Sequence, residues 1–148
     1  MNIFKSKLEK ATNLKNEGNV FFKNKDYAQA INTYGSGLQV LSPNQFYGAT
    51  KDELEKMAEI SSILLNNMGT CYFNSYDWQR AEIFYSEAIV INPKYVKAIH
   101  KRALARFELK KYDESFADIK LAFSLDKGNQ EIYESYKKIL EKYNEWVK

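Results

Sequence analysis

Small and aromatic residues recur at two fixed offsets in this chain of 148 residues, and no other feature constrains its fold as strongly. The reference positions, in the middle of the chain, are Gly69, Tyr72, Trp78, Ala81, Tyr85, Ala88 and Pro93. The positions 34 residues later are Ala103, Arg106, Tyr112, Ser115, Ile119, Ala122 and Lys127. The positions 51 residues earlier are Gly18, Phe21, Tyr27, Ala30, Tyr34, Gly37 and Ser42. Such self-similarity predicts stacked structural repeats, in which small residues allow helices to approach closely and aromatic rings fill the gaps.

Each repeat is predicted to be a pair of helices. The chain has only six Gly and two Pro, and its hydrophobic content of 45% is enough for a sizeable core. The dipeptides Asp26-Tyr27, Asp77-Trp78 and Lys111-Tyr112 share one register, and each is expected to open a second helix after a short turn. We therefore predict a single all-α domain over 1–148, with repeats at 11–44, 62–95 and 96–129.

The difference between the two offsets implies an insertion, at 45–61, between the first and second repeats. Its beginning, at 44–49, is predicted to be a loop. From Thr50 the pattern becomes helical, because Thr50 and Glu53 have the spacing of a capping box and apolar residues then recur at helical intervals. The first helix of the second repeat is therefore expected to extend backwards. Residues 130–147 also have apolar residues at helical spacing and are expected to form a capping helix.

Stacked helix pairs enclose a concave groove that is lined by the first helix of each pair. By 3.6-residue arithmetic, repeat positions 2, 5, 6, 9, 12 and 13 of that helix share the face opposite the packed positions 4, 7, 8 and 11, so they are expected to turn toward the groove. The predicted lining is Thr12, Lys15, Asn16, Asn19, Phe22 and Lys23, then Ile63, Asn66, Asn67, Thr70, Phe73 and Asn74, then Lys97, His100, Lys101, Leu104, Phe107 and Glu108. A groove with ammonium groups, amides and aromatic rings suits an extended peptide that carries carboxylates.

These spacings resemble the tetratricopeptide repeat, a helix-turn-helix unit of 34 residues with small residues near positions 8, 20 and 27. The middle copy matches best, with Gly69, Ala81 and Ala88 at the small positions, whereas the third copy is degraded and has Ser115 at one of them. The resemblance implies a right-handed superhelix of three repeats followed by a C-terminal capping helix.

Within that family, the chain resembles the co-chaperone domains that hold the C-terminal carboxylates of heat-shock chaperones in a two-carboxylate clamp. The family pattern is Lys-x-x-x-Asn in the first helix, Asn in the third, and Lys-x-x-x-Arg in the fifth. The matching residues are Lys15, Asn19, Asn67 and Lys97, while Lys101 stands where the family usually has Arg and its neighbour Arg102 falls on the packed face. The resemblance implies a co-chaperone module that binds the C-terminal Glu-Glu-Val-Asp of heat-shock protein 90 or 70. The predicted peptide site consists of the five clamp residues Lys15, Asn19, Asn67, Lys97 and Lys101, together with Phe22, Thr70 and Asn74.

The insertion and the long third helix look like the repeat domains of large immunophilins. Those proteins join such a module to an FKBP-type or cyclophilin-type peptidyl-prolyl isomerase domain, and small co-chaperones that stand alone fit almost as well. A different hypothesis is a repeat scaffold that binds an internal segment of a non-chaperone partner.

Other classes of function find little support in the sequence. The single Cys rules out a Cys-cluster zinc site, and the single His leaves little general acid–base capacity near neutral pH, so we expect no cofactor, no metal and no enzymatic activity. Cys71 is predicted to be a buried, inert thiol. His100 is predicted to be neutral, because Lys97 and Lys101 disfavour its charged form. The net charge of +3 gives no reason to expect nucleic acid, and the lack of a secretory signal or long apolar run predicts a cytoplasmic protein without membrane contact.

Overall fold

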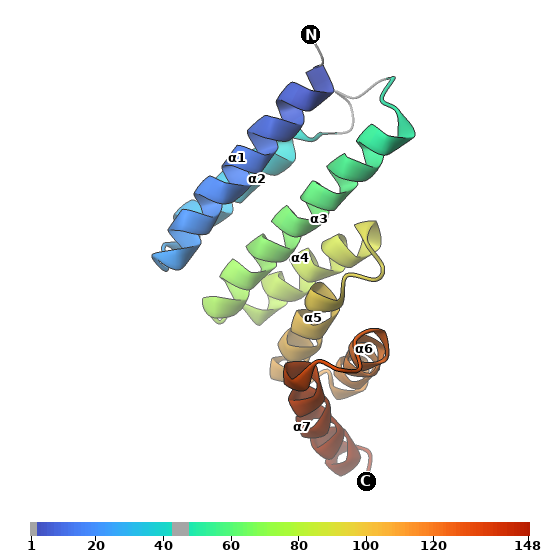
Figure 1. Cartoon of the computed structure of the whole chain (residues 1–148). Coiled ribbons are helices and arrows are strands. Elements are labelled where there is room, and N and C mark those ends of the chain that lie inside the picture. The colour runs from blue at the N-terminus through green and yellow to red at the C-terminus, as the bar shows by residue number, and fades with distance from the viewer. Residues whose placement is uncertain (1–2, 43–47) are drawn as a thin grey trace.

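The computed structural model describes residues 3–42 and 48–148, so residues 44–47 of the predicted loop lie outside the described part. Within it all regular structure is helical, with α1 (Ile3–Lys23), α2 (Tyr27–Val40), α3 (Lys51–Asn74), α4 (Trp78–Ile91), α5 (Val96–Glu108), α6 (Tyr112–Leu125) and α7 (Gln130–Trp146). Each helix packs on the next one along the chain, and α1, α3, α5 and α7 also contact one another in turn. The stack is elongated, with the two termini at opposite ends (Figure 1). The predicted three helix pairs and C-terminal helix are confirmed.

The helices of the described residues show no candidate for a membrane span, because none combines sufficient length with sufficient apolar character.

The same turn joins the two helices of every repeat. Lys25, Tyr76 and Lys110 occupy equivalent repeat positions, and each has a left-handed backbone, with φ of 60°, 63° and 63°. The second helix then begins at Tyr27, Trp78 and Tyr112, as the sequence predicts. In the first two repeats an Asp side chain caps this helix by accepting a hydrogen bond from a backbone N–H of the first turn.

Close packing within the first two repeats depends on a glycine beneath a tyrosine ring. Gly18 lies under Tyr34 and Gly69 lies under Tyr85, and the two tyrosines are 1% and 0% exposed. A Cβ atom would lie 2.5 Å from the Tyr34 ring at position 18 and 2.8 Å from the Tyr85 ring at position 69. A side chain at either position would therefore push a buried ring away.

The helix α3 extends backwards to a length of 24 residues, as predicted. The Oγ1 atom of Thr50 accepts a hydrogen bond from the backbone N–H of Glu53 at 3.1 Å, and the Glu53 carboxylate accepts one from the backbone N–H of Thr50 at 3.0 Å. This confirms the predicted capping box. Met57 in the extension is 6% exposed and belongs to a core cluster that Leu8 of α1 also packs against. The extension therefore stabilises the N-terminal half of α1.

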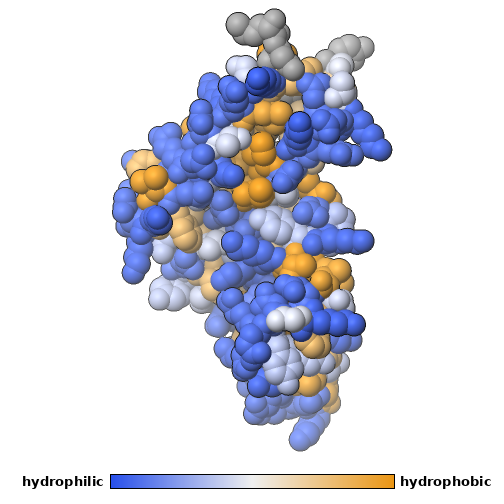
Figure 2. Space-filling model, in the orientation of Figure 1, coloured by the Kyte–Doolittle hydropathy of each residue, from blue (hydrophilic) through white to orange (hydrophobic). Residues whose placement is uncertain are grey.

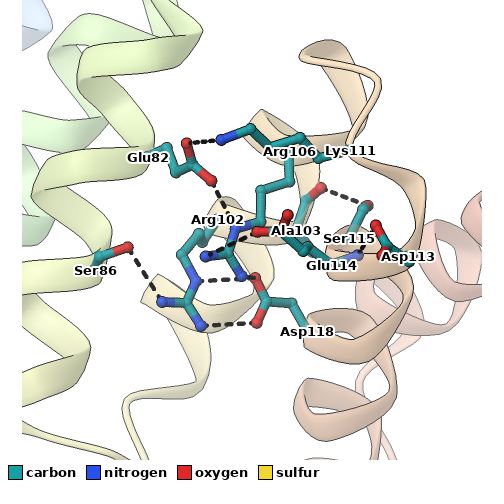
Figure 3. A network of polar contacts seen from close by, with 10 residues as sticks. All are labelled: Glu82, Ser86, Arg102, Ala103, Arg106, Lys111, Asp113, Glu114, Ser115 and Asp118. Atoms are coloured by element: carbon teal, nitrogen blue, oxygen red, sulfur yellow. Dashed lines mark hydrogen bonds and ion pairs between the residues drawn. The ribbon is translucent and has the colours of Figure 1, made fainter.

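A buried ion network joins the second and third repeats (Figure 3). Arg102 of α5 donates hydrogen bonds to both carboxylate oxygens of Asp118 on α6, at 2.9 and 2.8 Å, and to the hydroxyl of Ser86 on α4 at 3.1 Å. Arg106 donates to Asp118 at 3.0 Å and to Glu82 of α4 at 2.8 Å. The side chain of Arg102 is 17% exposed, which confirms that it packs inward. These bonds fix the orientation of α5 and leave its other face toward the groove.

Candidate functional site: a cationic groove

A groove of about 520 Å³ lies between α1, α3 and the beginning of α5. Its lining residues are Lys15, Asn19, Phe22, Tyr34, Ile63, Asn66, Asn67, Thr70, Tyr95, Lys97 and Lys101. The structure therefore brings together the five predicted clamp residues, with Phe22 and Thr70 beside them. Asn74 does not line the groove, because it is the exposed last residue of α3, one turn beyond Thr70.

Three ammonium groups reach this groove from two sides. Lys15 comes from α1, and Lys97 and Lys101 lie one turn apart on α5. In the described part of the chain, none of the three has a carboxylate within ion-pair distance. The Nζ atom of Lys101 lies 5.3 Å from the centre of the Phe73 ring, which is a cation–π contact. The groove therefore presents positive charge to an anionic ligand.

Two amides lie among these cations, and one of them is already oriented. The hydroxyl of Tyr34 donates a hydrogen bond of 2.6 Å to Oδ1 of Asn19. The Nδ2 atom of Asn67 lies 3.5 Å from the same oxygen, at the outer limit of a hydrogen bond. With its oxygen engaged, Asn19 has its Nδ2 group left to donate. Amide N–H groups and ammonium groups are donors that suit a carboxylate.

Two further polar side chains of the groove, those of Thr70 and Asn66, differ in their hydrogen bonding within the protein. The hydroxyl of Thr70 donates to the backbone carbonyl of Asn66 at 3.1 Å and pairs with the hydroxyl of Tyr85 at 2.9 Å. The side chain of Asn66 is 1% exposed, and its Oδ1 atom has no hydrogen-bond partner in the described residues. Periodicity places Asn66 on the groove face, but no sequence signal reveals its burial.

The prediction that His100 lines this groove is wrong, because α7 covers it. His100 is 6% exposed, and its Nε2 atom shares a hydrogen bond of 2.9 Å with the hydroxyl of Ser135 on α7. Burial lowers the pKa of His100, Lys101 lowers it further, and Glu131 opposes them. The direction of this shift agrees with the predicted neutral, hydrogen-bonding histidine, and its main cause is burial rather than the flanking lysines. Burial also raises the pKa of Cys71 to about 12, as expected of an inert thiol.

A larger hollow of about 670 Å³ lies between the N-terminal halves of α1 and α3. In the upper part of Figure 2, apolar side chains gather in this region and hydrophilic ones flank them. The lining residues are Lys5, Leu8, Glu9, Thr12, Asn13, Glu53 and Lys56. Two glutamates there balance two lysines, whereas the smaller groove has three lysines and no acidic lining residue. The smaller groove is therefore the better candidate for an anionic ligand.

Comparisons with known proteins give the same picture of the fold. No family model matches the sequence. The chain is 30% identical to the human protein unc-45 homolog B over 129 residues, which are 87% of this chain and 12% of that protein. It is 29% identical to human RNA polymerase II-associated protein 3 over 131 residues, which are 88% of this chain and 17% of that protein. The chain thus spans less than a fifth of the length of these relatives.

Two solved structures of high similarity are tetratricopeptide-repeat domains. The C-terminal domain of an FK506-binding protein from Plasmodium falciparum has a TM-score of 0.85 and 27% identity, with 97% of this chain and 95% of that chain covered. The first repeat domain of RNA polymerase II-associated protein 3, solved with the heat-shock protein 90 peptide SRMEEVD, has a TM-score of 0.73 and 28% identity. That match covers 90% of this chain and 92% of the other. Together with the helical stack of the described residues, these similarities show that the chain has the tetratricopeptide-repeat fold and is similar to a domain solved with a heat-shock protein 90 peptide.

Proposed function

We propose that this domain binds the C-terminal Glu-Glu-Val-Asp of heat-shock protein 90 or 70 in the cationic groove. The observation that carries the proposal is the convergence of Lys15, Lys97 and Lys101 on one cavity that has no acidic lining residue. A cluster of ammonium groups without carboxylate partners attracts an anion, and a carboxylate accepts charge-assisted hydrogen bonds from such groups. A peptide that ends in Asp brings two carboxylates close together, one from the side chain and one from the terminus.

The distribution of donors fits two carboxylates better than one. Lys15, Asn19 and Asn67 form one set at the contact between α1 and α3, and Lys97 and Lys101 form another on α5. Each set can hold one carboxylate by charge-assisted hydrogen bonds. Similar domains support the proposal, because structures of RNA polymerase II-associated protein 3 contain the heat-shock protein 90 peptide SRMEEVD and the heat-shock protein 70 peptide SGPTIEEVD.

Isothermal titration with these two peptides, each as the free acid and as the C-terminal amide, tests the proposal. We expect both free acids to bind and each amide to bind at least tenfold more weakly, since a charge-assisted contact is worth about 1.5–3 kcal/mol. Equal affinity for acid and amide would support the alternative, which is a scaffold that binds an internal segment of another partner. If none of the four peptides binds, the proposal is refuted.

The role of this module in a longer protein is also a proposal. The domain itself is a peptide-binding module of a non-catalytic kind. Its likeness to the repeat domain of an FK506-binding protein supports a parent that carries a peptidyl-prolyl isomerase domain, with this domain as the targeting part. We also propose a cytoplasmic location for the longer protein, which is consistent with the free, buried thiol of Cys71. Sequencing of the complete transcript and fluorescence microscopy of the tagged protein test these two points.

A further inference from the structure

The orientation of the Asn19 side chain decides whether it attracts or repels a carboxylate. A carboxamide has a donor end and an acceptor end of nearly the same shape, and only the N–H end stabilises a carboxylate. Asn19 is exposed, so packing does not select one orientation. Some other group has to make the selection if Asn19 is to act as a donor in the groove.

The hydroxyl of Tyr34 makes this selection. It donates to Oδ1 of Asn19 at 2.6 Å, a short hydrogen bond that occupies the acceptor end. The Nδ2 group of Asn67 approaches the same oxygen to 3.5 Å. If the Asn19 carboxamide were turned over, two NH₂ groups would face each other, so Asn67 favours the same orientation. Burial raises the pKa of Tyr34 to about 12, which keeps its hydroxyl proton in place near neutral pH.

Comparison with the second repeat distinguishes the hydrogen bond of the Tyr34 hydroxyl from the packing of its ring. Tyr85 is the equivalent of Tyr34, its ring covers Gly69 as the Tyr34 ring covers Gly18, and it is equally buried. The hydroxyl of Tyr85, however, pairs with Thr70, which is not an amide. The two tyrosines therefore share a structural role, and only the hydroxyl of Tyr34 contacts an amide of the proposed clamp.

We propose that Tyr34 is a positioning residue of the peptide site, whose hydroxyl holds the Asn19 carboxamide with its N–H groups available to a ligand carboxylate. This inference rests on the proposed function, since it assigns how one donor of that site is oriented. It predicts that Tyr34 acts only through Asn19.

A double-mutant cycle tests this dependence. Tyr34→Phe, Asn19→Ala and the double variant are titrated with the peptide Ser-Arg-Met-Glu-Glu-Val-Asp, and thermal unfolding of each is recorded. Loss of one hydrogen bond of ordinary strength corresponds to about three- to tenfold weaker binding for Tyr34→Phe. We expect no further loss when Tyr34→Phe is added to Asn19→Ala. Tyr85→Phe is the matched control, because it removes the same hydroxyl from the equivalent position, and its effect is expected to be the same with and without Asn19→Ala.

Two results would overturn the inference while the proposed function stands: unchanged affinity of Tyr34→Phe, or an equal loss in both backgrounds. Absence of peptide binding by the unmodified domain would instead refute the proposed function. A second measurement does not use peptide and works on the unmodified domain. The ¹⁵N heteronuclear NOE of the Asn19 side-chain amide is expected to be higher than that of Asn16, which is exposed and, contrary to the sequence prediction, does not line the groove. Equal values would show that Asn19 rotates freely and would also overturn the inference.

Discussion

Lys101 and Arg102 are adjacent cations on α5, and exchanging each for Ala distinguishes ligand binding from folding. Lys101 lines the groove, with its Nζ atom 5.3 Å from the centre of the Phe73 ring. Arg102 points the other way, into the ion network with Asp118 and Ser86. We therefore expect Lys101→Ala to weaken peptide binding and Arg102→Ala to destabilise the fold.

The magnitudes follow from the contacts. Lys101→Ala would remove the proposed charge-assisted contact to the peptide, which is worth about 1.5–3 kcal/mol, or about ten- to a hundredfold in affinity. Its effect on stability is limited to a partly exposed cation–π contact of about 0.5–1 kcal/mol. Arg102→Ala leaves the carboxylate of Asp118, which is 4% exposed, with Arg106 as its remaining ion-pair partner among the described residues. Breaking a buried ion pair costs about 3–5 kcal/mol, and we expect the lower end because Arg106 stays.

Two measurements check this prediction. Calorimetric unfolding should show a melting temperature about 10 °C lower for Arg102→Ala and within about 3 °C of the unmodified domain for Lys101→Ala. Titration at a temperature where both variants are folded should show the loss of affinity in Lys101→Ala alone. Lys101→Arg is the conservative variant and should bind at least as tightly, because a guanidinium can engage both carboxylate oxygens. Loss of binding in Arg102→Ala at an unchanged melting temperature, with none in Lys101→Ala, would refute the assignment of α5.

Three further predictions concern charge, pH and packing. Peptide affinity should fall steadily between about 50 and 500 mM salt in a titration series, because exposed ammonium–carboxylate contacts are screened, and a constant affinity would contradict a lysine-lined site. The pKa of His100 is held below its ordinary value of 6.5, so the unfolded chain binds protons more readily, and the free energy of unfolding should decrease as the pH falls from about 7 to 5. Urea unfolding at three pH values should show that the free energy of unfolding depends less steeply on pH in His100→Gln than in the unmodified domain. The same pH dependence in both proteins would exclude His100 as the cause. Gly69→Ala should cost about 1–3 kcal/mol in urea unfolding, because its Cβ would lie 2.8 Å from the buried Tyr85 ring. The control Gly128→Ala, with nothing within 4 Å of its Cβ, should change little, and an equal effect would refute the packing argument.

Residue spacing along the chain was enough to predict the repeat register and, for the five clamp residues, the helix face that turns toward the groove. Both are local properties, since a period of 3.6 residues places Lys15 and Asn19, or Lys97 and Lys101, one above the other. The capping box at Thr50 is local as well, because it depends on residues three apart. For these reasons residue spacing alone was enough to predict that the five clamp residues share one groove.

The pairing of side chains between helices could not be predicted from residue spacing. Nothing in the periodicity predicts that α7 covers His100 with Ser135, which is 35 residues away, or that Asn66 is buried with an oxygen lacking a partner in the described residues. The ion network of Arg102 and the hydrogen bond from Tyr34 to Asn19 also join different helices. Such contacts depend on the crossing angles and rotamers of packed helices, which the spacing of residues along a single helix does not specify.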